Sequence, residues 1–287
     1  MQRPLVTVAI SFFNNQDTLG DAITSVMNQS FPNWELILID GGSADRSLEV
    51  ARQYADDRIR IVAEGRYMSF VESLNQSVSL AAGKYYARMD ADDVMHPERL
   101  EQQVRFLNEN PNVDAVDTAM YVMNQEGKLT GERRVPAPAE WTLRSILSGH
   151  VLNHATVMGR VEWFRSHPYD PLYVRAEDME LWCRTVGRSV FARIMRPLYY
   201  VREGKVNVAN YRKSQETSRR IFKQYGPQSL TPGEIRVLVL KTYLKAWLYT
   251  VLGWVGMQDM LTRARSRKLE PGVLGDAQRM LIAGLER

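Results

Sequence analysis

The chain has 287 residues, of which 45% are hydrophobic and 24% are charged, and its formal net charge is +4. These values exclude a disulfide-stapled miniprotein and a disordered polyelectrolyte, and they allow one large domain with a sizeable core. The single cysteine, Cys183, forms no internal disulfide and favours a reducing compartment. We expect no secretory signal, and the apolar stretch at 246–257 is too short to span a bilayer.

The N-terminal part alternates between strand and helix patterns. Short apolar runs predict strands at 5–10, 34–40, 58–63, 85–89 and 113–120. Amphipathic periodicity and capping residues predict helices between them, at 17–28, 45–55, 69–82 and 97–110. This alternation implies crossover units, so the sequence predicts an α/β fold with a mostly parallel central sheet flanked by helices.

The pattern becomes irregular after residue 127, where prolines mark loops. Short helices are predicted at 140–147 and 178–186. After Arg193 the sequence predicts a mostly helical C-terminal extension, with helices at 213–225, 233–254, 258–267 and 274–285.

Charge is distributed unevenly between the two parts of the chain. Residues 1–192 contain 19 Lys or Arg and 26 Asp or Glu, whereas residues 193–287 contain 18 Lys or Arg and 7 Asp or Glu. Such asymmetry indicates different partners for the two parts, although ordinary variation between helix surfaces is an alternative.

Polar residues follow three of the predicted strands. Ligands of open α/β sheets bind beyond the carboxyl ends of the strands, where this chain places Ser11, Phe13, Asp40, Asp90, Asp92 and Asp93. Three acids within four residues repel one another and raise each other's pKa. A hard divalent cation, Mg²⁺ or Mn²⁺, would offset that cost, with a diphosphate as its usual companion. The alternative is an exposed acidic turn in which Asp93 caps the next helix.

Other kinds of site are less well supported. The chain lacks the dinucleotide glycine fingerprint and the phosphate-loop motif. His150 and His154 are four residues apart, but no third ligand stands at a zinc-like spacing, so a loop or core role is expected for both. Cys183 lies within a helical pattern and is expected to pack rather than react. Asp178 stands at the start of a predicted helix. It either caps that helix or projects into the same cleft as a general base.

Five segments, in their order and spacing, resemble the family 2 inverting glycosyltransferases of the GT-A fold. They are VAISFFNN, LILIDGGSADRS, LNQSVSLAAGKYYARMDADDVMHPERLEQQVRFL, HATVMGR and AEDMELWCR. The stretch at 87–116 is especially similar to the subgroup that includes amylovoran-type bacterial exopolysaccharide transferases. The resemblance covers about 5–202. It implies a catalytic domain at 1–205, with a nucleotide-binding part at about 1–120 and an acceptor-side part at about 121–205, followed by a basic helical region at 206–287.

The resemblance also implies roles for single residues. Ser11, Phe13 and Asp40 match positions that line the nucleotide pocket, and Phe13 packs on the base. Asp90 matches the contact to the ribose or base, Asp92 matches the ligand of a Mn²⁺ or Mg²⁺ ion, and Asp93 is a weaker candidate. Asp178 matches the catalytic base. Two positions depart from the pattern: Gly41 stands where many relatives have a second acid, and Phe13 stands where tyrosine is common.

The implied activity is transfer of a sugar, with inversion, from a nucleotide-sugar donor, with a UDP-sugar favoured. The implied acceptor is a saccharide or a polyprenyl-diphosphate-linked saccharide in bacterial exopolysaccharide, capsule or O-antigen biosynthesis. A sugar nucleotidyltransferase is an alternative, although the chain lacks a glycine-rich N-terminal loop with a basic residue. A non-catalytic GT-A-fold binding protein is a second alternative, which the retained Asp90, Asp92 and Asp178 disfavour.

The basic C-terminal region adds a prediction about location. Cationic residues at 193–223 precede an aromatic-rich stretch at 238–254, a combination suited to an anionic membrane surface. We therefore expect a cytoplasmic protein in peripheral contact with the inner membrane. The alternatives are packing of this stretch on the catalytic domain or a dimer interface. Nucleic-acid binding is not expected, because no recognised module accompanies the basic residues.

Overall fold

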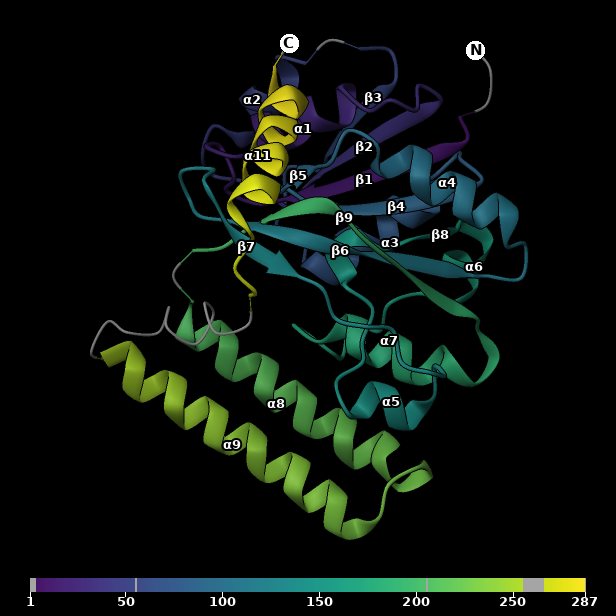
Figure 1. The fold of residues 1–287 in the computed structure, drawn as a ribbon, viewed down its shortest axis with the longest axis vertical. Coiled ribbons are helices and arrows are strands. Elements are labelled where there is room, and N and C mark those ends of the chain that lie inside the picture. Colours follow the sequence, from purple (N-terminus) through teal and green to yellow (C-terminus); the bar gives the residue numbers. More distant parts are fainter. Residues whose placement is uncertain (1–3, 55, 205, 255–265, 287) are drawn as a thin grey trace.

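The computed structural model describes residues 4–54, 56–204, 206–254 and 266–286 (Figure 1). These residues form one nine-stranded sheet in the order β3-β2-β1-β4-β8-β6-β9-β5, with β7 paired to β6. The strands are β1 (Val6–Phe12), β2 (Trp34–Asp40), β3 (Ile59–Ala63), β4 (Tyr85–Asp90), β5 (Val94–Met95), β6 (Ala115–Met123), β7 (Leu129–Arg133), β8 (Met158–Arg160) and β9 (Phe191–Arg202).

Helices cover the sheet and extend beyond it. They are α1 (Leu19–Met27), α2 (Ser47–Arg52), α3 (Phe70–Leu80), α4 (Arg99–Glu109), α5 (Leu143–Leu147), α6 (Val161–Ser166), α7 (Glu177–Thr185), α8 (Val208–Tyr225), α9 (Pro232–Trp254) and α11 (Pro271–Leu285). The helix predicted at 258–267 falls largely on 255–265, outside the described residues. The predicted alternation of strands and helices up to residue 120 is confirmed.

The sheet is mixed rather than mostly parallel throughout. β1 runs parallel to β2 and β4, β2 runs parallel to β3, and β6 runs parallel to β9. The remaining ladders, β4 with β8, β8 with β6, β6 with β7 and β5 with β9, are antiparallel. Parallel neighbours need crossover helices, which the sequence shows clearly, whereas β6 and β7 are joined by a short turn through Gly127. The parallel prediction therefore holds best for the N-terminal strands.

The prediction that the chain becomes mostly helical after Arg193 is wrong for residues 194–202. Residues Phe191–Arg202 form β9, whose arginines each find an acidic partner. Arg193 pairs with Asp117, both side chains being fully buried, and Arg202 pairs with Asp21. Arginines normally indicate a solvated surface, whereas here β9 is paired with β6 and β5 and these two arginines are matched by distant acids.

Two apolar layers hold the sheet between helices. On one face, β1 and β2 contribute side chains such as Val8, Ile10 and Leu36, which pack with α1 and α4. On the other face, α3, α6 and α7 contribute a second cluster that includes Trp182. β-branched and aliphatic residues buried on both faces are typical of strands inside an α/β sheet.

The C-terminal region has two different attachments. α8 and α9 form a helical hairpin beside α7, and α9 lies on the outer side of α8, away from the sheet (Figure 1). α11 instead returns to the sheet, where Ala277 and Leu281 pack with residues of β5 and β7. Within the described ranges, no helix combines the length and the apolar character needed to cross a membrane.

Candidate active site

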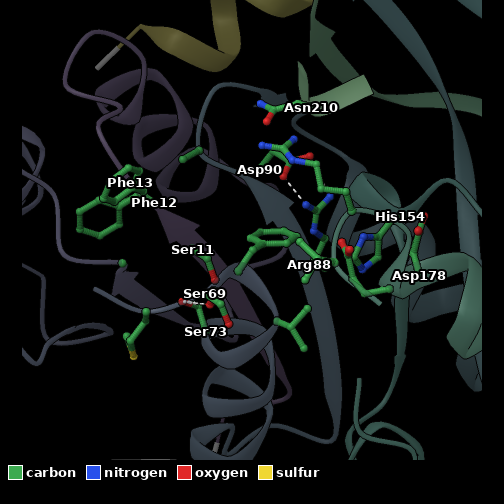
Figure 2. Close-up of a pocket in the computed structure, with 18 of the residues that line it drawn as sticks. Ser11, Phe12, Phe13, Ser69, Ser73, Arg88, Asp90, His154, Asp178 and Asn210 are labelled. Atoms are coloured by element: carbon green, nitrogen blue, oxygen red, sulfur yellow. Dashed lines mark hydrogen bonds and ion pairs between the residues drawn. The ribbon is translucent and has the colours of Figure 1, made fainter. Parts of the chain in front are cut away.

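A cavity of about 820 Å³ lies beyond the carboxyl ends of β1 and β4 and reaches α7 and α8 (Figure 2). Five residues singled out from the sequence line it: Ser11, Phe13, Asp90, Asp92 and Asp178. Phe13 and Asp178 lie on opposite sides of the view in Figure 2, with Asp90 between them. Residues more than 160 positions apart in the chain therefore share one cavity.

Strand register explains why the residues at the ends of β1, β2 and β4 lie close together. Phe12 is opposite Asp40 in the β1–β2 ladder, and Ser11 is opposite Asp90 in the β1–β4 ladder. All of these strands end at the same edge of the sheet, so the residues that follow them meet there. The Ser11 hydroxyl is buried and has no hydrogen-bond partner among the described residues, so a ligand in the cavity could supply one.

Asp40 is placed differently. It is buried, it is not among the residues that line the cavity, and its carboxylate accepts a hydrogen bond of 2.9 Å from the Ser43 amide. The adjacent Gly41 lines the cavity instead. Gly42 has a φ of +87°, and a Cβ atom there would approach the Arg66 carbonyl oxygen to 2.6 Å, so this turn requires glycine. The Asp40 carboxylate thus holds the turn, and a contact between it and a nucleotide stays a prediction.

Two aromatic residues stand at the β1 side of the cavity. Phe13 is 48% exposed and Tyr67 is 70% exposed, and their rings meet edge to face at 5.8 Å. Exposed aromatic rings on a cavity wall offer stacking surface to a planar base. Tyr67 is absent from the sequence prediction, because it stands in a loop that carries no periodic signal.

Arg88 and Asp90 form an ion pair at the end of β4. The Arg88 guanidinium donates hydrogen bonds to both carboxylate oxygens of Asp90, and the distance from its Nη1 to Oδ2 is 2.8 Å. The dashed line in Figure 2 marks this pair. The Arg88 side chain is buried and lies over the Phe70 ring. Although burial opposes its charge, the Asp90 carboxylate raises the pKa of Arg88, so Arg88 is a permanent cation within the cavity.

The acidic turn contains two further carboxylates with different environments. Asp93 is buried, does not line the cavity, and accepts a hydrogen bond of 2.7 Å from the Arg202 amide. It does not cap α4, whose N-cap residue is Glu98, so the capping alternative is wrong. Asp92 lines the cavity, where partial removal from water and the charge of Asp90 raise its pKa to about 6.

The residues present fit a divalent cation only in part. Among the described residues, no group of three or more His, Cys, Asp or Glu side chains is arranged to hold a metal. Asp90 is engaged with Arg88, whereas Asp92 forms no ion pair within the described part of the chain. One free carboxylate suffices for Mg²⁺ or Mn²⁺ when substrate phosphates and water complete the coordination, so the donor set is compatible with a cation that arrives with a diphosphate.

The α7 side of the cavity presents a pair of acids. Asp178 is the second residue of α7, whose N-cap is Ala176 without a side-chain cap, so the alternative role of Asp178 as a cap is wrong. Burial raises the pKa of Asp178, and burial together with the charge of Asp178 raises the pKa of Glu177 to about 7. Arg175 precedes this turn with a φ of +67°, a strained conformation of the kind that accompanies functional sites. A carboxylate with a raised pKa on a rigid helix start is well suited to accept a proton.

Some residues that line the cavity were not predicted from the sequence to belong to a functional site. His154, expected in a loop or core, lines the cavity, and its Nε2 lies 2.9 Å from the Tyr169 hydroxyl. Burial and the Arg88 charge lower the pKa of His154 well below its usual range, so its ring is neutral. Arg88 could have been found, because residues 88 and 90 share one face of a strand. Cys183 is buried and burial raises the pKa of its thiol to about 12, in agreement with a packing role.

Comparison with known proteins identifies close sequence relatives. Residues 7–169 match the family model described as glycosyl transferase family 2. The putative glycosyltransferase EpsE of Bacillus subtilis is 36% identical over 207 residues, which are 70% of this chain and 73% of that protein. WfgD of Escherichia coli, named UDP-Glc:alpha-D-GlcNAc-diphosphoundecaprenol beta-1,3-glucosyltransferase, is 25% identical over 178 residues, 62% of this chain and 68% of that protein.

Solved structures with the same fold have more distant sequences. S. aureus TarS in complex with UDP has a TM-score of 0.61 and 16% identity, covering 83% of this chain and 70% of that chain. The mannosyltransferase PcManGT of Pyrobaculum calidifontis, in complex with GDP-Man and Mn²⁺, has a TM-score of 0.59 and 17% identity. The match covers 99% of this chain and 86% of that chain. These likenesses confirm the predicted GT-A fold.

Proposed function

Because the chain belongs to glycosyl transferase family 2, we propose that it transfers a sugar, with inversion, from a nucleotide-diphosphate donor to an acceptor hydroxyl in the cavity that Asp92 and Asp178 share. The observation that carries this proposal is that one cavity joins the Asp92 carboxylate, which has no ion-pair partner in the described part of the chain, to the Asp178 carboxylate of raised pKa. The first fits a cation-bound diphosphate and the second fits proton removal from an attacking hydroxyl.

Each group has a separate task in such a reaction. Asp178 takes the proton of the acceptor hydroxyl as the new bond forms at the anomeric carbon, which typically contributes about 10²–10⁴-fold. Arg88 fixes the Asp90 carboxylate, which is the proposed contact to the ribose or base. Asp92 would hold Mn²⁺ or Mg²⁺, which would supply Lewis-acid neutralisation of the charge on the leaving diphosphate. The cavity holds donor and acceptor together, which supplies the proximity contribution.

The donor is proposed to be a nucleotide sugar, with a UDP-sugar favoured. Phe13 and Tyr67 offer stacking surface to its base, and the unpaired Ser11 hydroxyl adds a polar contact. WfgD is named for UDP-Glc, TarS was solved with UDP, and PcManGT was solved with GDP-Man and Mn²⁺. Gly41 stands where the resemblance expects a second acid, so the proposed base contacts do not include a carboxylate at position 41.

The acceptor is proposed to be a saccharide carried on a polyprenyl diphosphate, in bacterial polysaccharide biosynthesis at the cytoplasmic face of the inner membrane. WfgD is named for a diphosphoundecaprenol acceptor. Arg175, Asn210 and Lys213 also line the cavity, and the two cations among them would suit an acceptor with an anionic group. The proposed division of labour therefore assigns the donor to residues up to about 120 and the acceptor to the residues that follow.

A donor screen tests this proposal. The protein is incubated with Mn²⁺ and each of a panel of UDP- and GDP-sugars, and release of the nucleoside diphosphate is measured with and without a lipid-diphosphate saccharide. The proposal expects release from one donor, increased by acceptor and abolished by chelation of the metal. In a parallel incubation with a nucleoside triphosphate and a sugar 1-phosphate, formation of nucleotide sugar would instead show a sugar nucleotidyltransferase. Donor binding without any turnover would show a non-catalytic binding protein.

A further inference from the structure

Among the described residues, the outer side of α9 carries an exposed apolar surface that none of them covers. Its exposed large side chains, here called the outer stripe, are Val237, Leu240, Tyr243, Leu244, Trp247 and Trp254. Trp247 is 62% exposed and Trp254 is 84% exposed, whereas Thr242 and Tyr249 on the other side are buried against the rest of the molecule. Large contiguous apolar surfaces of this kind mark interaction sites, because soluble monomers rarely leave them in water.

A second cavity, of about 560 Å³, lies between α8 and α9 beside this stripe. We call it the basic groove; it is lined by Glu216, Arg219, Arg220, Lys223, Gln224 and Tyr243. Arg219 lies over the Tyr243 ring at 4.2 Å, so the groove and the outer stripe share Tyr243. Lys223 forms no ion pair within the described residues. Three cations against one carboxylate make the groove suited to a phosphate group.

We propose that the α8–α9 hairpin docks on an anionic phospholipid bilayer, with the outer stripe inserted at the headgroup boundary and a lipid phosphate in the basic groove. This assigns the membrane contact of the proposed function to a particular surface and to anionic lipids. It rests on the proposed function only in assuming that the acceptor is bound to a membrane. A helix that lies on a bilayer buries an apolar face and places Lys and Arg beside it.

Charge complementarity selects this occupant over a second copy of the chain. Residues 206–254 contain eight Lys or Arg and two Glu, and Lys241 and Lys245 border the outer stripe in exposed positions. Two copies facing each other through α9 would bring these cations together, whereas an anionic bilayer neutralises them. Long lysine side chains also reach the headgroups while their methylenes cover apolar surface.

The position of the groove relative to the active site supports the same arrangement. α8 carries Asn210 and Lys213 in the active-site cavity near its start, and Arg220 and Lys223 in the basic groove further along. Arg220 also donates to the Leu172 carbonyl oxygen at 3.2 Å, in the segment that leads to Asp178. One helix thus connects the membrane surface to the acceptor side of the cavity, as a lipid-anchored acceptor requires.

Vesicle co-sedimentation of the full chain tests the inference without any sugar transfer. Wild type is expected to bind phosphatidylglycerol-containing vesicles and to bind pure phosphatidylcholine vesicles much more weakly. Arg220→Gln/Lys223→Gln should bind about 30-fold more weakly, at about fivefold per cation. Leu244→Gln/Trp247→Gln, at exposed positions, should bind at least tenfold more weakly. Arg220→Lys/Lys223→Arg should bind as wild type does.

The matched control removes the same charge elsewhere. Arg52→Gln/Arg60→Gln changes two exposed arginines of α2 and β3, at the opposite end of the molecule from α9 (Figure 1), and should leave binding unchanged. Circular dichroism establishes that each variant is folded.

Three results would each overturn the inference. They are equal binding of wild type to both vesicle types, unchanged binding by the groove or stripe variants, and a dimer in solution that the stripe variant dissociates. Donor hydrolysis without vesicles reports separately on the proposed function.

Discussion

The Arg88 guanidinium holds both oxygens of the Asp90 carboxylate, and this pairing divides the acids of the β4 turn into different roles. Asp90 is fixed beside a permanent cation, and Asp93 is buried against the Arg202 amide. Asp92 is left facing the cavity without an ion-pair partner among the described residues. A cluster that looks uniform in sequence therefore offers one free carboxylate to a cation.

Asp92→Ala is expected to abolish the dependence of donor binding on metal. Without its carboxylate, a Mn²⁺ ion loses its proposed protein ligand and remains bound to the donor alone. Calorimetry with the preferred donor should show tight binding by wild type with Mn²⁺, weak binding with EDTA, and equally weak binding by the variant under both conditions. Retention of the full Mn²⁺ effect by Asp92→Ala would move the metal site elsewhere. Asp57→Asn, at an exposed position, serves as the control.

Tyr67→Ala is expected to weaken donor binding by about fivefold to 150-fold, because stacking of a base on an aromatic ring contributes about 1–3 kcal/mol. Tyr67→Phe should retain wild-type affinity, since the ring rather than the hydroxyl provides the surface that meets Phe13. Titration with the nucleoside diphosphate alone measures this effect. Equal affinities of the alanine variant and wild type would show that the base lies away from this aromatic pair.

Glu177→Gln is expected to change how stability depends on pH. Burial and the Asp178 charge raise the pKa of Glu177 from 4.5 to about 7, so its stabilising contribution is complete below about pH 4.5 and is lost as the pH rises through 7. The glutamine cannot ionise, and the variant should therefore gain about 1–3 kcal/mol relative to wild type between pH 4 and pH 8. Urea unfolding at both pH values measures it. A constant difference between the two proteins would refute the raised pKa.

Asp117→Ala is expected to destabilise the fold by about 3–5 kcal/mol, because it leaves the Arg193 guanidinium buried without its counter-ion. Both side chains of this pair are fully buried between β6 and β9. Urea unfolding provides the measurement, and Glu49→Ala, which removes an exposed partner of Arg46, should cost less than about 1 kcal/mol. A loss at Asp117 as small as that at Glu49 would contradict a structural role for the buried pair.

The sequence predicts much of this fold because its N-terminal strands and helices follow simple rules. Buried strands such as 34–40 contain a run of four aliphatic residues, and acids at the ends of strands meet at one edge of the sheet. β9 escaped prediction because Arg193 and Arg202 resemble surface residues until their partners Asp117 and Asp21, distant in sequence, are known. The short strands β5 and β8 carry too few residues to show any period.

The candidate site was predicted best where a residue's position along a strand decides its role. Ser11 and Asp90 follow from strand register, and Asp178 follows from the family resemblance. Tyr67 lies in a loop, His154 starts a short 3-10 helix and Lys213 lies on the distant helix α8, so only the folded chain brings them to the cavity. Pattern analysis of single segments contains no information on such contacts.

The central claim is that Asp178 removes the acceptor proton in the cavity that also holds the donor. Asp178→Asn keeps the size and polarity of the side chain but cannot take a proton at neutral pH. Steady-state transfer and donor affinity are measured together for this variant and wild type, with Mn²⁺ and the preferred donor. We predict that turnover falls by about 10²–10⁴-fold while the donor Kd stays within about twofold. Undiminished turnover by Asp178→Asn would contradict the claim.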